Sequence, residues 1–271
     1  MKLFVFEGKK DSRIFDTLTG IFFPEEKDRI VCVYRSNIYS LYKKLEDLDV
    51  FGSSRHNGST VSVLKEILAA HGDSTLSDVS EAEISEVYLF FDYDFQQTQH
   101  SLNKNNEQVR KMLEYFDDET ENGKLYIHYP MLESIRYTKV LPDEDYCRYS
   151  VERDVCNSFK DLVQRFSAYP SLKYLTLTKK DSRQRQEEVE RNWEHLLRMN
   201  VGKAHFLCQG NEEIPKNKIL VSQTNIYANQ LQKYVEKQPC KVSILNAFPL
   251  FLFEYFPIDR FCEAFKESVQ I

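Results

Sequence analysis

The chain has 271 residues, of which 42% are hydrophobic and 29% are charged, and its net charge at pH 7 is −6. This composition is typical of a folded globular protein and excludes a chain that is disordered throughout, because such chains contain too few apolar residues to form a core. The length suits one large domain or two small ones, and the negative charge gives no overall signal for nucleic-acid binding.

Strands and helices alternate in the first half of the chain. Apolar runs predict four strands, at Leu3–Phe6, Ile30–Tyr34, Val87–Phe91 and Leu125–Tyr129. Apolar residues at helical spacing predict helices at Lys9–Leu18, Ile38–Leu48, Val61–Ala70, Asn105–Phe116 and Met131–Val140. Residues 51–60 form a polar loop and residues 117–124 a turn. The alternation predicts an α/β fold with a mostly parallel sheet flanked by helices.

The second half of the chain has a different pattern. Helical spacing recurs at Val151–Phe166, Ser182–Met199 and Ile226–Val235, and the stretch from Ser243 to Val269 predicts one or two aromatic-rich helices broken near Pro257. Residues 172–177 fit a strand or the end of a helix. We therefore predict an α/β domain over 1–145 and a mainly helical C-terminal domain over 146–271, with the connection at residues 141–149.

Three apolar strands lead into acids. Glu7 follows LFVF, Asp92 and Asp94 follow VYLFF, and Glu133 comes shortly after LYIHYP. Ligands of an open parallel sheet gather beyond the carboxyl ends of its strands, so neighbouring strands would bring these four acids together. Converging carboxylates repel one another unless a cation lies between them, and Mg²⁺ is held by such carboxylates. In an extended segment Asp92 and Asp94 point the same way while Tyr93 packs elsewhere.

The segments LFVFEGKKD, VYLFFDYD and LYIHYPMLES together resemble the TOPRIM domain of topoisomerases, primases and OLD-type nucleases, over roughly residues 1–140. The closest branch by motif is the OLD-like one, which includes nucleases of phage defence. The resemblance implies that Glu7, Asp92 and Asp94 are catalytic metal ligands and that Glu133 and Asp11 are further ligands. The long interval between Glu7 and Asp92 implies an insertion around residues 50–80.

The activity implied is metal-dependent cleavage of DNA or RNA by an endonuclease with Mg²⁺ or Mn²⁺ as cofactor. No ATPase domain precedes the TOPRIM-like part, so an effector of this branch would have its ATPase on another chain or would have none; control by a partner ATPase is the expectation. Two other functions stay open: a non-catalytic TOPRIM-like protein for binding or assembly, and nucleotidyl transfer of the primase kind. The phage-defence role follows by analogy at the level of the fold.

Several cations are candidate nucleic-acid contacts. From Arg148 to Lys203 the chain carries 12 Lys and Arg against 8 Asp and Glu. That basic segment suits a polyanion-binding face, and a random scatter of surface charge explains it as well. The candidates are Lys9, Lys10, Arg136, Lys179, Lys180, Arg183 and Arg185. The last four lie near Trp193, which could stack on a base; exposed ion pairs and a core position for Trp193 are the stronger interpretation.

The remaining features favour a protein of the cytoplasm. The six cysteines form no CxxC pair and no zinc-type cluster with histidine, so we expect buried thiols. No signal peptide and no bilayer-spanning segment is predicted. We expect His100 to be exposed in a loop and His128 to be packed within its strand. The stretch 246–256 is expected in the core or in a homodimer interface.

Overall fold

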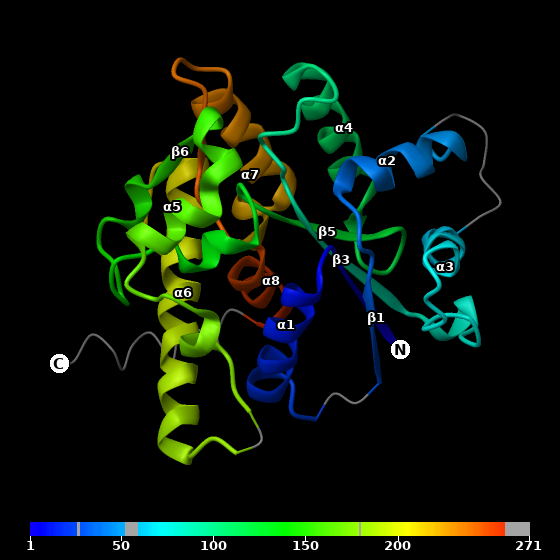
Figure 1. Ribbon diagram of the computed structural model, residues 1–271, viewed down its shortest axis with the longest axis horizontal. Helices are drawn as coiled ribbons and strands as arrows, with labels where there is room; N and C mark the ends of the chain where they lie inside the picture. The colour runs from blue at the N-terminus through cyan, green and yellow to red at the C-terminus, as the bar shows by residue number, and fades with distance from the viewer. Residues whose placement is uncertain (26–27, 52–58, 179, 258–271) are drawn as a thin grey trace. The chain divides into compact units, whose positions relative to one another are not determined.

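The structure is a computed structural model that describes residues 1–25, 28–51, 59–178 and 180–257 (Figure 1). The chain divides into two compact units, Met1–Met131 and Leu132–Ile271. The division falls N-terminal to the connection predicted at residues 141–149. Among the helices described, none has the length and apolar character needed to cross a bilayer.

The first unit is built on a five-stranded sheet in the order β2-β1-β3-β5-β4 (Figure 1). Its strands are β1 (Lys2–Phe6), β2 (Arg29–Val33), β3 (Glu86–Asp92), β4 (Asp117–Asp118) and β5 (Gly123–His128). The four longer strands are parallel, and the short β4 pairs antiparallel with β5. The predicted mostly parallel α/β sheet is confirmed, with β4 added inside the segment that was expected to be a turn.

Three of the four α-helices described in the first unit begin at a residue whose side chain caps the helix. The helices of this unit are α1 (Lys9–Phe22), α2 (Ile38–Asp47), α3 (Thr60–Ala70), α4 (Leu102–Tyr115) and the 3₁₀ turn η1 (Glu81–Glu83). Asn37, Ser59 and Ser101 each accept a hydrogen bond from a main-chain N–H in the first turn of α2, α3 and α4. Such caps satisfy amide groups that a helix leaves unpaired at its start. Helix α3 lies within the predicted insertion around 50–80.

One face of this sheet is lined by aromatic rings that pack against α1. Phe4 stacks on Tyr88 at 5.0 Å and Phe90 stacks on Tyr126 at 5.3 Å, between ring centroids. Phe15 of α1 contacts Phe4 at 4.4 Å. Because alternate strand residues share a face, the next residues in the same alternation, Asp92 and His128, lie on the α1 side at the carboxyl end of the sheet.

The strand order identifies where a ligand would bind in such a sheet. From β1 the chain passes through α1 to β2 on one side, and from β2 it returns across β1 to β3 on the other side. Parallel crossovers are right-handed, so these two connections run over opposite faces of the sheet. The carboxyl ends of β1 and β3 therefore flank a topological switch point, the usual ligand position of open α/β sheets.

The second unit is mainly helical over the residues described, as predicted. Its helices are α5 (Phe159–Phe166), α6 (Arg183–Gln209), α7 (Gln223–Gln230) and α8 (Ala247–Tyr255), and β6 (Ser150–Glu152) pairs antiparallel with β7 (Lys241–Ser243). Short 3₁₀ turns are η2 (Leu132–Arg136), η3 (Tyr146–Arg148), η4 (Arg153–Ser158), η5 (Leu172–Leu175) and η6 (Lys218–Val221), and a π turn, η7 (Leu231–Val235), extends α7.

Two helix predictions in this unit are wrong in part. The segment 131–140 forms only the 3₁₀ turn η2, because Ser134 donates to the main chain of Leu245 and Thr138 donates to Asp143 instead of supporting a helix. The segment 151–166 begins in strand β6 and becomes α-helical only in α5. Tertiary contacts override helical periodicity in both places.

The core of the second unit contains a buried polar network. Asn200 Oδ1 accepts hydrogen bonds from Tyr146 Oη at 2.9 Å and from the Asn246 main-chain N–H at 2.8 Å. Asn246 Nδ2 donates to Ser134 Oγ at 3.0 Å. Trp193 is fully buried and its Nε1 donates to the Leu175 carbonyl, which confirms the core interpretation of this residue and excludes a stacking role. The apolar residues of α8 are buried as well.

Candidate metal centre

Three acids that the sequence placed at strand ends come together at the switch point. Glu7, Asp92 and Asp94 each offer a carboxylate oxygen, and these oxygens lie within 4.8 Å of one another. Ligands on opposite sides of one Mg²⁺ ion lie about 4 Å apart, so this spacing suits a shared divalent cation. All three side chains are half-buried, which leaves the group open to a ligand.

Main-chain hydrogen bonds hold Glu7 between its two neighbouring strands. Its N–H donates to the Phe90 carbonyl and its carbonyl accepts from the Arg35 N–H, both at 3.0 Å. The Glu7 side chain also reaches β3, because Oε2 accepts from the Asp92 N–H at 2.9 Å. Glu7 is thereby tied to the residue that carries the next carboxylate of the group.

Asp94 joins the group by a different route from the one expected. The expectation was an extended Asp-x-Asp segment, but β3 ends at Asp92 and Asp94 has a φ of 49°, in the left-handed region. Aspartate tolerates this region better than most residues. Tyr93 packs into the unit and donates to Asn106 Oδ1 at 2.6 Å, as predicted. Gln96 Nε2 donates to Asp94 Oδ1 at 3.0 Å and orients the carboxylate.

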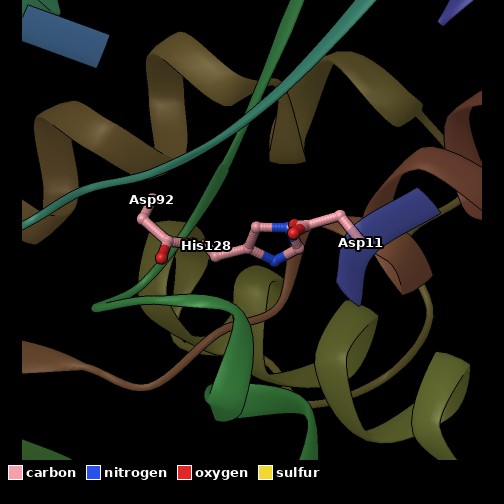
Figure 2. A group of neighbouring side chains, drawn as sticks. All are labelled: Asp11, Asp92 and His128. Atoms are coloured by element: carbon pink, nitrogen blue, oxygen red, sulfur yellow. The ribbon is translucent and has the colours of Figure 1, made fainter. Parts of the chain in front are cut away.

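A second group of ligand atoms shares Asp92. Asp11, Asp92 and His128 each offer one ligand atom, again within 4.8 Å of one another. Figure 2 shows the His128 ring between the side chains of Asp92 and Asp11. Asp92 and His128 are paired neighbours in the register of β3 and β5, so their side chains leave the sheet on the same face. Asp11 reaches this face from the first turn of α1.

The surroundings of Asp11 fit a cation. The residue is 4% exposed, and its Oδ1 has no hydrogen-bond partner within the described part of the chain. The same Oδ1 lies 3.5 Å from His128 Nε2, which is too long for a good hydrogen bond. A buried carboxylate needs compensation by a hydrogen bond, an ion pair or a metal ion. The donor set of carboxylate oxygens and one imidazole nitrogen suits divalent cations.

The other predicted ligand, Glu133, belongs to the second unit. It lies in η2, is 8% exposed, and its Oε1 is 4.0 Å from Lys160 Nζ. Its part in the metal centre stays a prediction.

The predicted nucleic-acid contacts fall into two classes. Lys9 and Lys10 are exposed in the first turn of α1, directly after Glu7 and Gly8. Arg136 is engaged within the second unit, where its Nη1 donates to the Pro170 carbonyl at 2.6 Å. That hydrogen bond competes with the predicted phosphate contact of Arg136.

The basic stretch before Trp193 follows the ion-pair interpretation. Arg183 pairs with Glu187 at 3.0 Å and Arg185 pairs with Glu188 at 2.8 Å. Lys180 is exposed, and Lys179 lies outside the described residues. Nucleic-acid binding by these four residues stays a prediction, and the two arginines would have to exchange a carboxylate for a phosphate.

Sequence reasoning missed two residues at this edge of the sheet. His128 was expected only to pack within its strand, yet its fully buried ring faces Asp11. Arg35 follows β2 with a φ of 63°, donates its N–H to Glu7, and keeps half of its side chain exposed beside Asp73. For His128 a signal existed, because it ends the strand LYIH just as Asp92 ends its own strand. His100 is exposed, as expected.

Comparison of the chain with family models, curated proteins and solved structures finds no match. The motifs and the geometry of the acids are therefore the basis for any functional assignment.

Proposed function

We propose that this chain is a metal-dependent phosphodiesterase that cleaves nucleic acid, with its active site at the carboxyl ends of β1, β3 and β5. One observation carries the proposal: Glu7, Asp92 and Asp94 meet within 4.8 Å at the switch point of a parallel sheet, and Asp92 also belongs to a second ligand group with Asp11 and His128. Carboxylates this close together repel one another when no cation is bound, and they serve as ligands when a divalent cation is bound.

The residues divide the work according to their positions. Asp92 is shared by both groups, so we assign it the central ligand role. Glu7 is fixed by the Asp92 N–H and is a ligand of the first group, while Asp94 completes that group from the turn after β3. Bound Mg²⁺ or Mn²⁺ would polarise the phosphate and lower the pKa of the attacking water.

Cations of the same unit supply the complement for a phosphate. Lys9 and Lys10 stand in the first turn of α1, where the helix dipole also favours a negative group. Arg35 follows β2 and is half exposed. We assign these three residues to substrate binding, because their charge offsets the phosphate backbone without selecting a sequence.

The finer assignment to a TOPRIM-type nuclease of the OLD-like branch is part of this proposal. It is supported by the order of the motifs, with Glu7 directly after β1 and the Asp-x-Asp beginning at the last residue of β3, on adjacent parallel strands. The roles of a partner ATPase and of phage defence follow from the resemblance and belong to the same proposal.

The test is a cleavage assay on purified full-length chain. Plasmid DNA, tRNA and total RNA are incubated with Mg²⁺, with Mn²⁺ or with EDTA, using wild type, Asp92→Asn and Glu7→Gln. The matched control is Asp47→Asn, which changes an exposed acid of the same unit. We expect cleavage with metal by wild type and by the control, and none by the two site variants.

Equal cleavage by Asp92→Asn and wild type would contradict the proposal. So would the absence of cleavage on every substrate, alone and in the presence of a co-expressed ATPase. In that case the acids would serve a non-catalytic binding protein.

A further inference from the structure

We propose that Asp11 and His128 form, together with Asp92, a second metal position, and that its nitrogen ligand makes this position prefer transition metals such as Mn²⁺ over Mg²⁺. The inference deepens the proposed function and rests on it for the shared ligand Asp92. Its test reads metal coordination directly, so the two can fail separately.

The first support is the placement of the three side chains on rigid elements. Asp92 ends β3 and His128 ends β5, and the two are paired residues of adjacent parallel strands. Asp11 lies in α1, one helical turn before Phe15, whose ring packs on Phe4 and Phe90 of the same sheet face. Residues four apart share a helix face, so the packing of Phe15 aims Asp11 at the end of the sheet. Figure 2 shows the resulting convergence.

The second support is the condition of Asp11 itself. A carboxylate that is only 4% exposed is expected to accept hydrogen bonds, and Oδ1 accepts none from the residues that the structure describes. The 3.5 Å separation from His128 Nε2 is too long for a direct hydrogen bond and lies within the range of two ligands of one ion. The nitrogen and the oxygen thus face each other across a gap that a metal ion would bridge.

The third support is the contrast in donor chemistry between the two groups. Glu7, Asp92 and Asp94 offer oxygen alone, which suits Mg²⁺. Asp11, Asp92 and His128 offer two oxygens and one nitrogen, and an imidazole nitrogen is a better ligand for first-row transition-metal ions, of which Mn²⁺ is the weakest binder, than for Mg²⁺. Because Asp92 is common to both, the two positions would lie side by side, as in two-metal phosphodiesterases.

The experiment is pulsed electron paramagnetic resonance on the full chain loaded with Mn²⁺, which detects ¹⁴N nuclei bonded to the ion. The samples are wild type, His128→Asn and the control His100→Asn, which changes an exposed loop histidine. We expect ¹⁴N modulation from imidazole in wild type and in the control, and none in His128→Asn. The affinity of the second position for Mn²⁺ should fall by about 10- to 100-fold in His128→Asn.

A second variant tests the preference for the metal. His128→Asp replaces the nitrogen with oxygen, so the second position should now bind Mg²⁺ and Mn²⁺ with similar affinity in calorimetric titrations. Retention of the first Mn²⁺ ion in both variants shows that the site region is folded.

The inference is overturned if wild-type protein binds Mn²⁺ without ¹⁴N modulation, or if His128→Asn keeps the modulation. Modulation together with a lack of cleavage would overturn the proposed function and leave the second metal position standing. Cleavage without ¹⁴N modulation would overturn the second metal position and leave the proposed function standing.

Discussion

Two sets of buried polar side chains, one in each unit, differ in how they are hydrogen-bonded. In the second unit Asn200, Asn246 and Lys203 are fully buried and hydrogen-bonded, with Lys203 Nζ donating to the carbonyls of Tyr146 and Tyr149. In the first unit Asp11 is almost as deeply buried, yet its Oδ1 lacks a hydrogen bond among the residues described. The hydrogen bonds of the second-unit network stabilise the fold, whereas the buried Asp11 Oδ1 lies beside the ligand atoms of Asp92 and His128, where a bound cation would supply its partner.

The largest expected effect comes from removing the shared acid of the first unit. Asp92→Asn should lower metal-dependent cleavage by about a thousandfold, because both ligand groups lose a carboxylate. Without metal, the free energy of unfolding of the variant should equal that of wild type or exceed it by up to about 1 kcal/mol, because one of the repelling charges is gone. Cleavage assays and urea titrations in EDTA measure the two effects. A large loss of stability in EDTA would contradict the contrast between the units.

The next largest effect is a loss of stability, without a loss of metal binding, in the second unit. Asn200→Leu leaves Tyr146 Oη and the Asn246 N–H without their shared acceptor, which should destabilise the chain by about 2 to 4 kcal/mol. Mn²⁺ affinity, measured by calorimetry below the unfolding transition, should not change. Asn103→Leu is the control, because Asn103 is exposed on a helix. Equal stability of Asn200→Leu and the control would show that the network is dispensable.

A smaller effect is the pH dependence that Lys203 imposes. Burial lowers the pKa of Lys203 from 10.5 to about 7, although Cys147 and Asp143 oppose this shift. Between pH 7 and 9 the unfolded chain then binds more protons at this residue than the folded chain, so its contribution to stability rises with pH, by up to about 1.4 kcal/mol per pH unit. Above that range Cys147 acts in the opposite sense, because burial raises its pKa from 9.0 to about 12.

The measurement is urea unfolding at pH 7, 8 and 9 for wild type, for Lys203→Met and for the exposed-lysine control Lys237→Met. The difference in stability between wild type and Lys203→Met should grow with pH in favour of wild type. A difference that stays constant across the three pH values would show that Lys203 keeps its proton in the folded state.

The smallest effect is expected at Gly8, where the backbone itself permits other residues. Its φ of −133° is ordinary, but an added methyl group would lie 3.2 Å from Asp11 Oδ2. Gly8→Ala should therefore displace Asp11 slightly and weaken the second Mn²⁺ ion by about two- to tenfold, measured by calorimetry. Gly20→Ala on the same helix meets no atom within 4 Å and serves as control. Unchanged affinity in Gly8→Ala would contradict the expected displacement of the Asp11 carboxylate.

Much of the first unit could be predicted from sequence, because its signals are local. The apolar runs of β1, β3 and β5 mark their own ends, and the acids Glu7, Asp92 and Asp94 stand where two of those runs stop. That they converge follows from the rule that parallel strands collect their ligands at one edge. The turn at Asp94 was missed, since its left-handed backbone depends on the residues after β3 and not on the spacing of the pair.

The features that could not be predicted depend on pairing between distant segments. His128 meets Asp92 only because β3 and β5 pair in one particular register, and a strand sequence does not state its register. The strand β6 was missed for the same reason, because Val151 pairs with Val242 far along the chain. The apolar spacing of residues 151–166 is helical and does not indicate pairing with a distant strand.

The hydrogen bond between the Glu7 side chain and the Asp92 N–H joins residues 85 positions apart in sequence. On the ribosome, β1 therefore emerges long before β3 and β5, and the carboxylates stay separate until all three strands have left the exit tunnel and paired. At about 5 to 20 residues per second, this delay lasts several seconds. A nascent or truncated chain that ends before Asp92 cannot assemble either ligand group. The candidate metal centre therefore forms only after the strands that carry its ligands have been synthesised.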